Sequence, residues 1–262
     1  LVNDADFVHF RNMTLQGLNT TYAYIVHLSG NTDGLSFENC RFTLPVSNGG
    51  IYGIYAVGSA SRNDLKIISS LFENGNFGID IRGNNSSGLL VEGNHFLNQR
   101  SYGAYLFHWL APQVNDNRFQ TNNSNASYRA LYCGEFHNDF EISGNRAHAP
   151  IGSYGFYFDY LDGGVAARGL IANNFVTVGD SSASNSNFVG MRYFGGSYTD
   201  IFYNSFNHAS NVGEAVQLFS NTTIDVKNNI MAATNGGYAL ECNMSPANVD
   251  AMDYNDFYSS GA

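Results

Sequence analysis

The amino-acid sequence predicts an all-β solenoid, a rod of about nine or ten stacked coils, from two repeating features. The first is an asparagine that recurs about every 23 to 30 residues, a spacing typical of stacked repeat architectures. The second is a pair of apolar positions around each asparagine, one three residues before it and one two residues after it. The asparagine column consists of Asn94, Asn117, Asn145, Asn174, Asn204, Asn229 and Asn255.

The apolar position before each asparagine continues into earlier coils, where another residue replaces the asparagine. We expect this position to form one stacked column of the core. The column would contain Phe37, Ile67, Val91, Val114, Ile142, Ile171, Ile201 and Val226. The asparagines themselves are expected at a sharp bend, because asparagine tolerates the left-handed backbone conformation there. Their side-chain amides can also hydrogen-bond from coil to coil, as stacked amide ladders do.

Each repeat also carries a second short segment in which apolar residues alternate, the pattern of a β-strand. Glycine, asparagine and serine stand at the joins, and no segment shows a helical period of 3.6 residues with capping residues. Two or three short strands per coil, stacked in register, give a single-stranded parallel β-helix. The second strands begin at residues 52, 77, 102, 128 and 154 in the central coils.

With these repeats the chain resembles the right-handed parallel β-helix, or pectin-lyase-like, superfamily over nearly its whole length. The resemblance implies one right-handed parallel β-helix domain over residues 1–262, but that fold hosts lyases, hydrolases, epimerases, tailspikes and inert stalks. The segment 253–261 is similar to one that recurs in long secreted and cell-surface β-helix proteins of bacteria. This second resemblance implies an extracellular or cell-surface location. The chain opens at Leu1 and neither end has the polar cap that solenoid ends need, so we expect a piece of a longer protein with flanking domains.

Composition excludes some partners. The chain has 12 lysines and arginines against 22 aspartates and glutamates, giving a formal net charge of −10. This charge argues against nucleic acid or an anionic membrane surface as a partner. The sequence has no apolar run of about 18 residues, so no membrane insertion is expected.

Alternation along the second strands predicts which side chains point outward. One outward column is expected to contain His27, Tyr55, Asp80, Tyr105, Leu131, Tyr157, Arg192, Gln217 and Glu241. Its neighbour is expected to contain Ser29, Val57, Arg82, Phe107, Cys133, Asp159, Phe194, Phe219 and Asn243.

A face that mixes aromatic rings with a few charges suits a polysaccharide, because rings cover the apolar faces of pyranoses and charged groups fix their hydroxyls. The alternative is that the rings only stack between coils, or lie beneath another strand or loop. The predicted substrate-binding residues are Asp80, Arg82, Tyr105, Phe107, His108, Trp109, Tyr157, Arg192 and Phe194.

Three carboxylates are the candidates for catalysis. Asp159, Glu135 and Asp162 come from adjacent coils near one face, where a pair could lie within the roughly 5–9.5 Å of glycosidase carboxylates. The alternative is that Asp162 belongs to a turn with Gly163 and Gly164, and that Glu135 is a solvated neighbour. His108 and His137 are candidate bases.

Several motifs of the enzymes in the resembled superfamily are missing. The sequence contains neither the Asn-Thr-Asp and Gly-His-Gly motifs of polygalacturonases nor the Arg-x-Pro-x-x-Arg motif of pectate lyases. These absences favour a non-catalytic extracellular module that binds polysaccharide. A polysaccharide lyase or glycoside hydrolase with a groove over the central coils is the alternative, and a trimeric tailspike is a third. No cofactor is predicted, although Asp4, Asp6, Asp253 and Asp256 could bind Ca²⁺.

Overall fold

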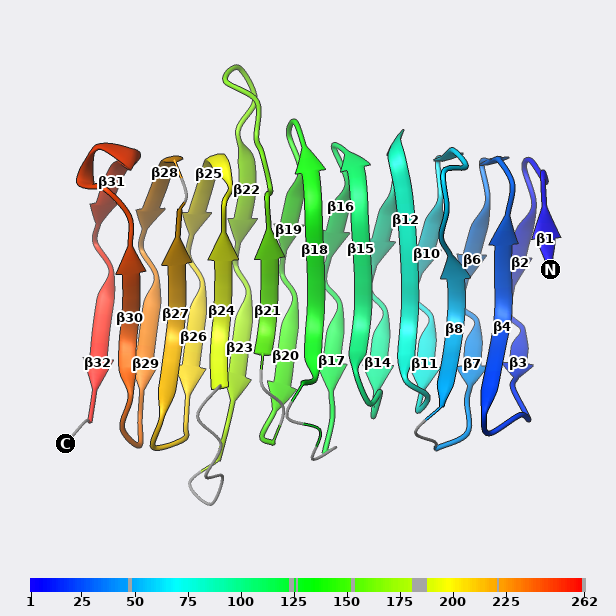
Figure 1. The fold of residues 1–262 in the computed structure, drawn as a ribbon, viewed down its shortest axis with the longest axis horizontal. Helices are drawn as coiled ribbons and strands as arrows, with labels where there is room; N and C mark the ends of the chain where they lie inside the picture. Colours follow the sequence, from blue (N-terminus) through cyan, green and yellow to red (C-terminus); the bar gives the residue numbers. More distant parts are fainter. Residues whose placement is uncertain are drawn as a thin grey trace.

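The computed structural model describes residues 1–46, 49–122, 125, 127–151, 154–180, 188–220 and 222–260. It is a parallel β-solenoid in which three ten-stranded sheets run side by side along a rod, with the two chain ends at opposite ends of the rod (Figure 1). Each coil gives one strand to each sheet, so the predicted all-β fold of about nine or ten coils is confirmed. The one helical element of the described residues is a 3₁₀ turn, η1 (Pro246–Asn248).

Sheet 1 has the longest strands and forms the front of the molecule in Figure 1. Its strands are β1 (Val2–Asn3), β4 (Tyr22–Ser29), β8 (Gly50–Ala56), β12 (Phe77–Ser87), β15 (Tyr102–Leu110), β18 (Arg129–His137), β21 (Tyr154–Asp159), β24 (Phe188–Phe194), β27 (Gly213–Phe219) and β30 (Tyr238–Asn243).

Sheets 2 and 3 form the two remaining walls. Sheet 2 comprises β2 (His9–Arg11), β6 (Ser36–Glu38), β10 (Lys66–Ile68), β13 (Leu90–Glu92), β16 (Gln113–Asn115), β19 (Glu141–Ser143), β22 (Gly169–Ala172), β25 (Ser197–Phe202), β28 (Thr222–Lys227) and β31 (Val249–Asp253). Sheet 3 comprises β3 (Thr14–Gln16), β7 (Arg41–Thr43), β11 (Leu71–Glu73), β14 (His95–Leu97), β17 (Arg118–Gln120), β20 (Arg146–Ala149), β23 (Phe175–Val178), β26 (Ser205–His208), β29 (Ile230–Ala233) and β32 (Asp256–Ser259). A small additional sheet pairs β5 (Thr32–Asp33) with β9 (Arg62–Asn63).

The core fills the inside of the coils. The predicted column from Phe37 to Val226 is confirmed, because its members face one another in register along sheet 2 and are all fully buried. On sheet 3, Phe42, Phe72, Phe96 and Phe119 stack with their rings nearly parallel and their centroids 4.5 to 4.9 Å apart. Identical register in successive coils therefore turns a sequence repeat into continuous packing.

The predicted asparagine ladder is confirmed at the bend between sheets 2 and 3. From Asn94 to Asn255, each Nδ2 donates to the Oδ1 of the next asparagine at 2.9 to 3.1 Å. Ser70 continues the ladder, since its backbone N–H donates to Asn94 Oδ1 at 2.9 Å. The prediction that the asparagines themselves adopt the left-handed backbone conformation is wrong. The residue with the positive φ is the one before each asparagine, such as Gly93, Asp116 or Tyr203.

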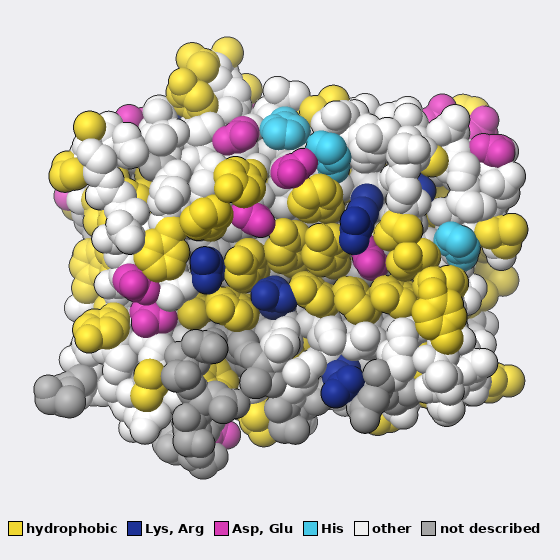
Figure 2. Space-filling model, viewed as in Figure 1, with side chains coloured by type: hydrophobic (Ala, Val, Ile, Leu, Met, Phe, Trp, Pro, Cys, Tyr) yellow, Lys and Arg dark blue, Asp and Glu magenta, His cyan; other side chains and the backbone are white. Residues whose placement is uncertain are grey.

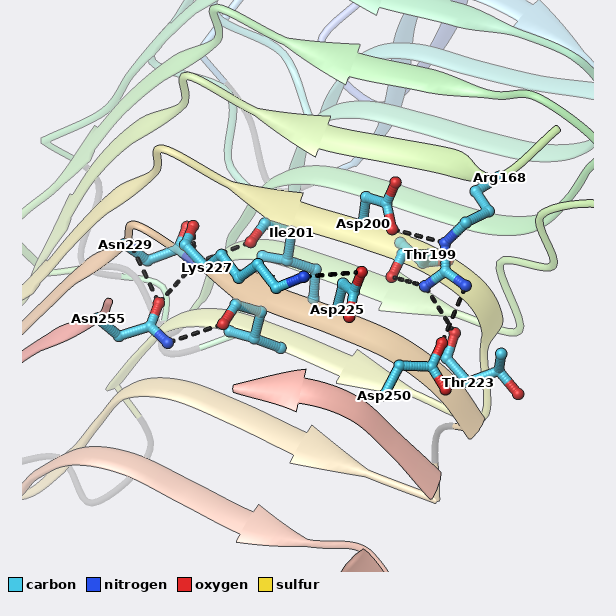
Figure 3. Close-up of polar contacts among 11 residues, drawn as sticks. Arg168, Thr199, Asp200, Ile201, Thr223, Asp225, Lys227, Asn229, Asp250 and Asn255 are labelled. Atoms are coloured by element: carbon cyan, nitrogen blue, oxygen red, sulfur yellow. Dashed lines mark hydrogen bonds and ion pairs between the residues drawn. The ribbon is translucent and has the colours of Figure 1, made fainter. Parts of the chain in front are cut away.

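A second polar cluster joins coils near the C-terminal end (Figure 3). Arg168 ends the loop that projects between β21 and β22, and its guanidinium ion-pairs with Asp200 at 2.6 Å and with Asp250 at 3.0 Å. The same guanidinium donates to the backbone oxygens of Thr199 and Thr223 at 3.2 and 3.0 Å. Arg168 thereby ties its own loop to three following coils.

Candidate functional site

The outward face of sheet 1 carries the predicted polysaccharide-binding residues. Figure 2 shows it as a band of hydrophobic side chains along the rod, interrupted by basic and acidic side chains. Most side chains of the band are partly exposed, and no described segment lies over it in that view. Within the part of the chain that the structure describes, the alternative of a ladder covered by another strand is therefore wrong.

The aromatic rings of this face stack on one another from coil to coil. Tyr105 and Tyr132 are nearly parallel, with centroids 4.4 Å apart, and Tyr157 follows at 5.4 Å from Tyr132. A second row runs through Tyr52, Phe77 and Tyr102. Because these rings face each other along the rod, they present edges and phenolic oxygens outward. The ring faces that we expected to stack on a sugar therefore stack on one another between coils.

The register of β18 differs from the sequence prediction by one residue. Leu131 and Cys133, expected to point outward, pair with Ala104 and Leu106 and are fully buried. The outward residue between them is Tyr132, which sequence reasoning missed. A slip of one residue along a strand exchanges its two faces, so this single offset misplaced the whole strand.

Trp109 is the predicted binding residue that the structure contradicts. Its side chain is fully buried and faces inward beside Phe136 of the next coil. It packs against the backbone of Gly83, where an added Cβ would lie 2.4 Å from the indole. Alternation changes just before Trp109, because His108 has a positive φ of 67°. Trp109 is therefore a core residue with no contact to a ligand on the face.

Two arginines lie among the rings of the face. The guanidinium of Arg129 stands 4.7 Å from the ring centroid of Tyr157, and that of Arg192 stands 5.3 Å from the same ring. Arg192 also lies over Phe194 and Phe219. The Nε atoms of both arginines are buried and have no hydrogen-bond partner. Sequence reasoning found Arg192 and missed Arg129.

Asp80 and Arg82 lie two residues apart on β12. Asp80 is 6% exposed although it points outward, and Arg82 Nε is 3.8 Å from its Oδ1. Burial raises the pKa of Asp80 to about 6, with the charge of Arg82 opposing that shift. The register between β12 and β15 shifts between Arg82 and Ser86, and the fully buried Arg62 lies next to this segment. Arg62 donates to the backbone oxygen of Arg82 at 2.8 Å and so supports this irregular segment.

The predicted catalytic carboxylates lie where sheet 1 ends at the centre of the rod. Positive φ values at His108 and Glu135 bend the chain there, and His108 Nε2 lies 2.9 Å from Glu135 Oε2. Asp159 accepts a hydrogen bond from the Tyr132 hydroxyl at 3.1 Å. Burial raises the pKa of Asp159, and the charge of Glu135 adds to the rise, while Tyr132 and Arg192 oppose it.

Asp162 has a more structural environment than Asp159. It forms isolated β-bridges with His137 and Ser197, and the Ser197 hydroxyl donates to its Oδ1 at 2.7 Å. The structure therefore brings Glu135, Asp159 and the two histidines to one end of the face. It leaves Asp162 at the margin, bound to sheet 2.

The aspartates considered for Ca²⁺ do not meet. Asp4 and Asp6 lie in the first coil, where their Oδ1 atoms accept hydrogen bonds from the backbone N–H groups of Asn31 and Asp33. Asp253 and Asp256 lie in the last coil, at the opposite end of the rod. No group of three histidine, cysteine, aspartate or glutamate side chains among the described residues is placed to hold a metal ion.

Comparison with known proteins places the chain in a fold family. A family model described as "Right handed beta helix region" matches residues 1–167, more than half of the chain, so the chain belongs to the right-handed β-helix family. No curated protein matches the sequence. Among solved structures, DFA-IIIase from Arthrobacter chlorophenolicus A6, in complex with GF2, matches at 11% identity with a TM-score of 0.36. That match covers 95% of this chain and 66% of the length of the other protein. The described residues include no helix long and apolar enough to span a membrane.

Proposed function

We propose that the outward face of sheet 1 binds polysaccharide as a non-catalytic, extracellular or cell-surface module. One observation carries the proposal: four polar side chains of this face have buried atoms that lack a hydrogen-bond partner. They are Asp80, Arg129, Arg192 and Gln217. Buried polar atoms in native proteins are nearly always paired, so a row of free acceptors and donors beside an exposed aromatic band suits a ligand rich in hydroxyls.

The band extends over several coils, which suits an extended chain better than a compact metabolite. Tyr105, Tyr132 and Tyr157 supply phenolic oxygens along the rod, and Arg192 supplies a fixed donor beside them. The net charge of −10 favours neutral glycans over bare polyanions.

A glycan array followed by calorimetry tests this role. Arg192→Ala and Tyr132→Ala should each weaken binding, whereas Arg146→Ala, an exposed arginine on sheet 3, should leave it unchanged. A full panel without any binding glycan would refute the proposal. Binding that is insensitive to both variants of the face would also refute it, because the ligand would then lie elsewhere.

A glycoside hydrolase is the second candidate, favoured by the unequal environments of two carboxylates. Burial and Glu135 raise the pKa of Asp159, as a general acid requires, whereas Glu135 is held against His108 at 2.9 Å. Reducing-end assays on every glycan that binds, with a parallel assay for unsaturated lyase products, separate the two roles. Turnover that is lost in Asp159→Asn or Glu135→Gln would establish the enzyme, and binding without turnover would establish the module.

A further inference from the structure

Asp80 is an outward-facing carboxylate that is nearly enclosed by its neighbours. In the register of sheet 1 it lies between Tyr55 on β8 and Tyr105 on β15. Its Oδ1 is fully buried and accepts no hydrogen bond. Arg82 Nε, at 3.8 Å, is too far for a hydrogen bond and gives only an ion pair.

Two other carboxylates on the outside of the rod accept hydrogen bonds from side chains of the protein. Glu38 accepts from Arg11 and from the Ser36 hydroxyl, and Glu141 accepts from the Ser143 hydroxyl. Asp225 has one buried unpaired oxygen, but its other oxygen binds Lys227 at 3.2 Å. Leaving a buried carboxylate without donors costs the full desolvation of the charge. Asp80 carries that cost on the face that we propose for ligand binding.

The surroundings of Asp80 limit what its missing donor can be. The side chain of Arg82 is 46% exposed and lies over the ring of Tyr105, 5.5 Å from its centroid, so the vicinity already holds a cation. A second cation would be repelled by Arg82, and a sugar carboxylate would be repelled by Asp80. A neutral hydroxyl donates a hydrogen bond without adding charge, and its apolar C–H groups can contact the tyrosine edges.

We propose that Asp80 is the specificity-determining anchor of the face, with Oδ2, the oxygen that is not fully buried, accepting a hydrogen bond from a hydroxyl of an uncharged sugar residue. This inference rests on the proposed polysaccharide-binding role and adds the residue by which the site selects an uncharged sugar. Uncharged glycans should bind, and uronate-rich glycans should be disfavoured at the same position.

The proposal implies that binding depends on pH. Hydrogen bonds to an ionised acceptor are about twice as strong as neutral ones, so protonation of Asp80 should weaken binding as pH falls through about 6. The groups facing Asp80 are Arg82 on its own strand, Tyr52 and Tyr55 on β8, and Tyr105 on β15. Burial raises the pKa of Tyr52 to about 12 and also raises that of Tyr105, so both stay neutral over this range. His27, whose ring lies 5.4 Å from that of Tyr55, is the nearby group to control for.

The experiment is isothermal titration of the whole chain at pH 5 and pH 7.5 with four probes. The probes are cellohexaose, xylohexaose, mannohexaose and hexagalacturonate. We expect at least one neutral hexasaccharide to bind about tenfold more tightly at pH 7.5 than at pH 5, the difference expected for one charge-assisted hydrogen bond. In Asp80→Asn, affinity at pH 7.5 should fall to the pH 5 level, and the pH dependence should vanish. His27→Gln and Asp225→Asn should keep the wild-type dependence.

The outcomes separate this inference from the proposed function. If neither these hexasaccharides nor the glycan array gives any binding to the wild-type chain, the polysaccharide-binding role itself fails. If a neutral hexasaccharide binds equally well to wild type and Asp80→Asn at both pH values, the role stands and the anchor is overturned. Tighter binding of hexagalacturonate than of every neutral probe would overturn the proposed selectivity. Circular dichroism and a melting curve on each variant confirm that the fold is intact.

Discussion

The bend between sheets 2 and 3 and the outward face of sheet 1 are both columns of repeated side chains, but they use their polar groups in opposite ways. At the bend, the amide of Asn145 donates to Val114 O and Asn174 Oδ1, and its oxygen accepts from the backbone and the amide of Asn117. On the face, Asp80 Oδ1 and the Nε atoms of Arg129 and Arg192 are buried without partners.

We interpret this difference as the one between a structural column and the face that we propose binds a ligand. A side chain that satisfies all its hydrogen bonds within the repeat stabilises the coil and has nothing left to offer a ligand. A side chain that keeps a buried donor or acceptor free destabilises the coil, and proteins tolerate such groups mainly where they serve binding or catalysis. Substitutions in the two columns should therefore change stability in opposite directions.

The largest effect is expected in the middle of the ladder. Asn145→Ala removes four hydrogen bonds and leaves several buried groups unpaired, so it should lower the free energy of unfolding by about 3 to 5 kcal/mol. Urea unfolding measures the change. Asn207→Ala, on the outer side of sheet 3, is the matched control and should stay within about 0.5 kcal/mol of wild type. Equal effects of the two substitutions would mean that the ladder contributes no special stability.

On the face, removal of the buried charge of Asp80 should stabilise the fold. The pKa of Asp80 is about 6 in the folded chain, against 3.8 for the free group, so the folded state binds the proton more tightly. The stability that Asp80 contributes is therefore complete below about pH 4 and is lost as pH rises towards 6. Asp80→Asn should gain about 2 kcal/mol at pH 7.5, after a discount for its own unpaired amide, and almost nothing at pH 4. Urea unfolding at pH 7.5 and at pH 4 measures the gain in stability. An equal gain at both pH values would contradict the prediction.

The sequence was sufficient for the ladder because its signal is local and repeated. Asn94 and its equivalents keep fixed distances to the apolar residues around them, and any one coil confirms the next. The face lacks such a marker. The segments between coils differ in length, so the start of β18 could be placed one residue early, which hid Tyr132. The shared pattern of a tyrosine between two apolar residues, at Tyr105, Tyr132 and Tyr157, was the available signal.

The burial of two other residues depends on features that the alternation of side chains along a strand does not predict. The sequence predicts Trp109 on the binding face, but the positive φ of His108 reverses the alternation there and turns the indole into the core. The sequence pattern does not predict the burial of Arg62, since arginine is almost never fully buried without a partner. It is held inside by backbone oxygens of Ala60, Val57 and Arg82, and these are set by the three-dimensional path of the chain.

The Arg168 cluster tests whether satisfied polar groups stabilise the rod outside the ladder. Arg168→Ala breaks the ion pairs with Asp200 and Asp250 and leaves two backbone oxygens without their donor. Because these groups are partly exposed, we expect a loss of about 1 to 2 kcal/mol, which should shrink in high salt. Urea unfolding at low and high ionic strength measures it. Arg168→Lys keeps the charge but not the forked geometry of the guanidinium, so its stability should lie between those of wild type and Arg168→Ala. If Arg168→Ala lost no unfolding free energy, satisfied polar groups would stabilise the rod only in the asparagine ladder.

The smallest effect concerns a hydrogen bond on the face that is satisfied, between Tyr132 and Asp159. The Tyr132 hydroxyl donates to Asp159 Oδ2 at 3.1 Å and lowers a pKa that burial and Glu135 raise. Tyr132→Phe removes only this oxygen, so the pKa of Asp159 should rise further, because the charged form loses its donor. The free energy of unfolding should change by less than about 1 kcal/mol, since the Asp159 carboxyl can bind a proton when it loses the tyrosine donor.

Titration of the Asp159 carboxyl carbon by NMR measures this shift directly. Tyr157→Phe is the matched control: it removes a hydroxyl from the next tyrosine of the same stack, which is not hydrogen-bonded to Asp159. If the chain hydrolyses glycans, the rate at high pH should fall later in Tyr132→Phe than in wild type, because a general acid with a higher pKa stays protonated longer. An Asp159 pKa that is unchanged in Tyr132→Phe would show that the hydrogen bond has no energetic weight, and that burial and the charges of Glu135 and Arg192 set the pKa of Asp159.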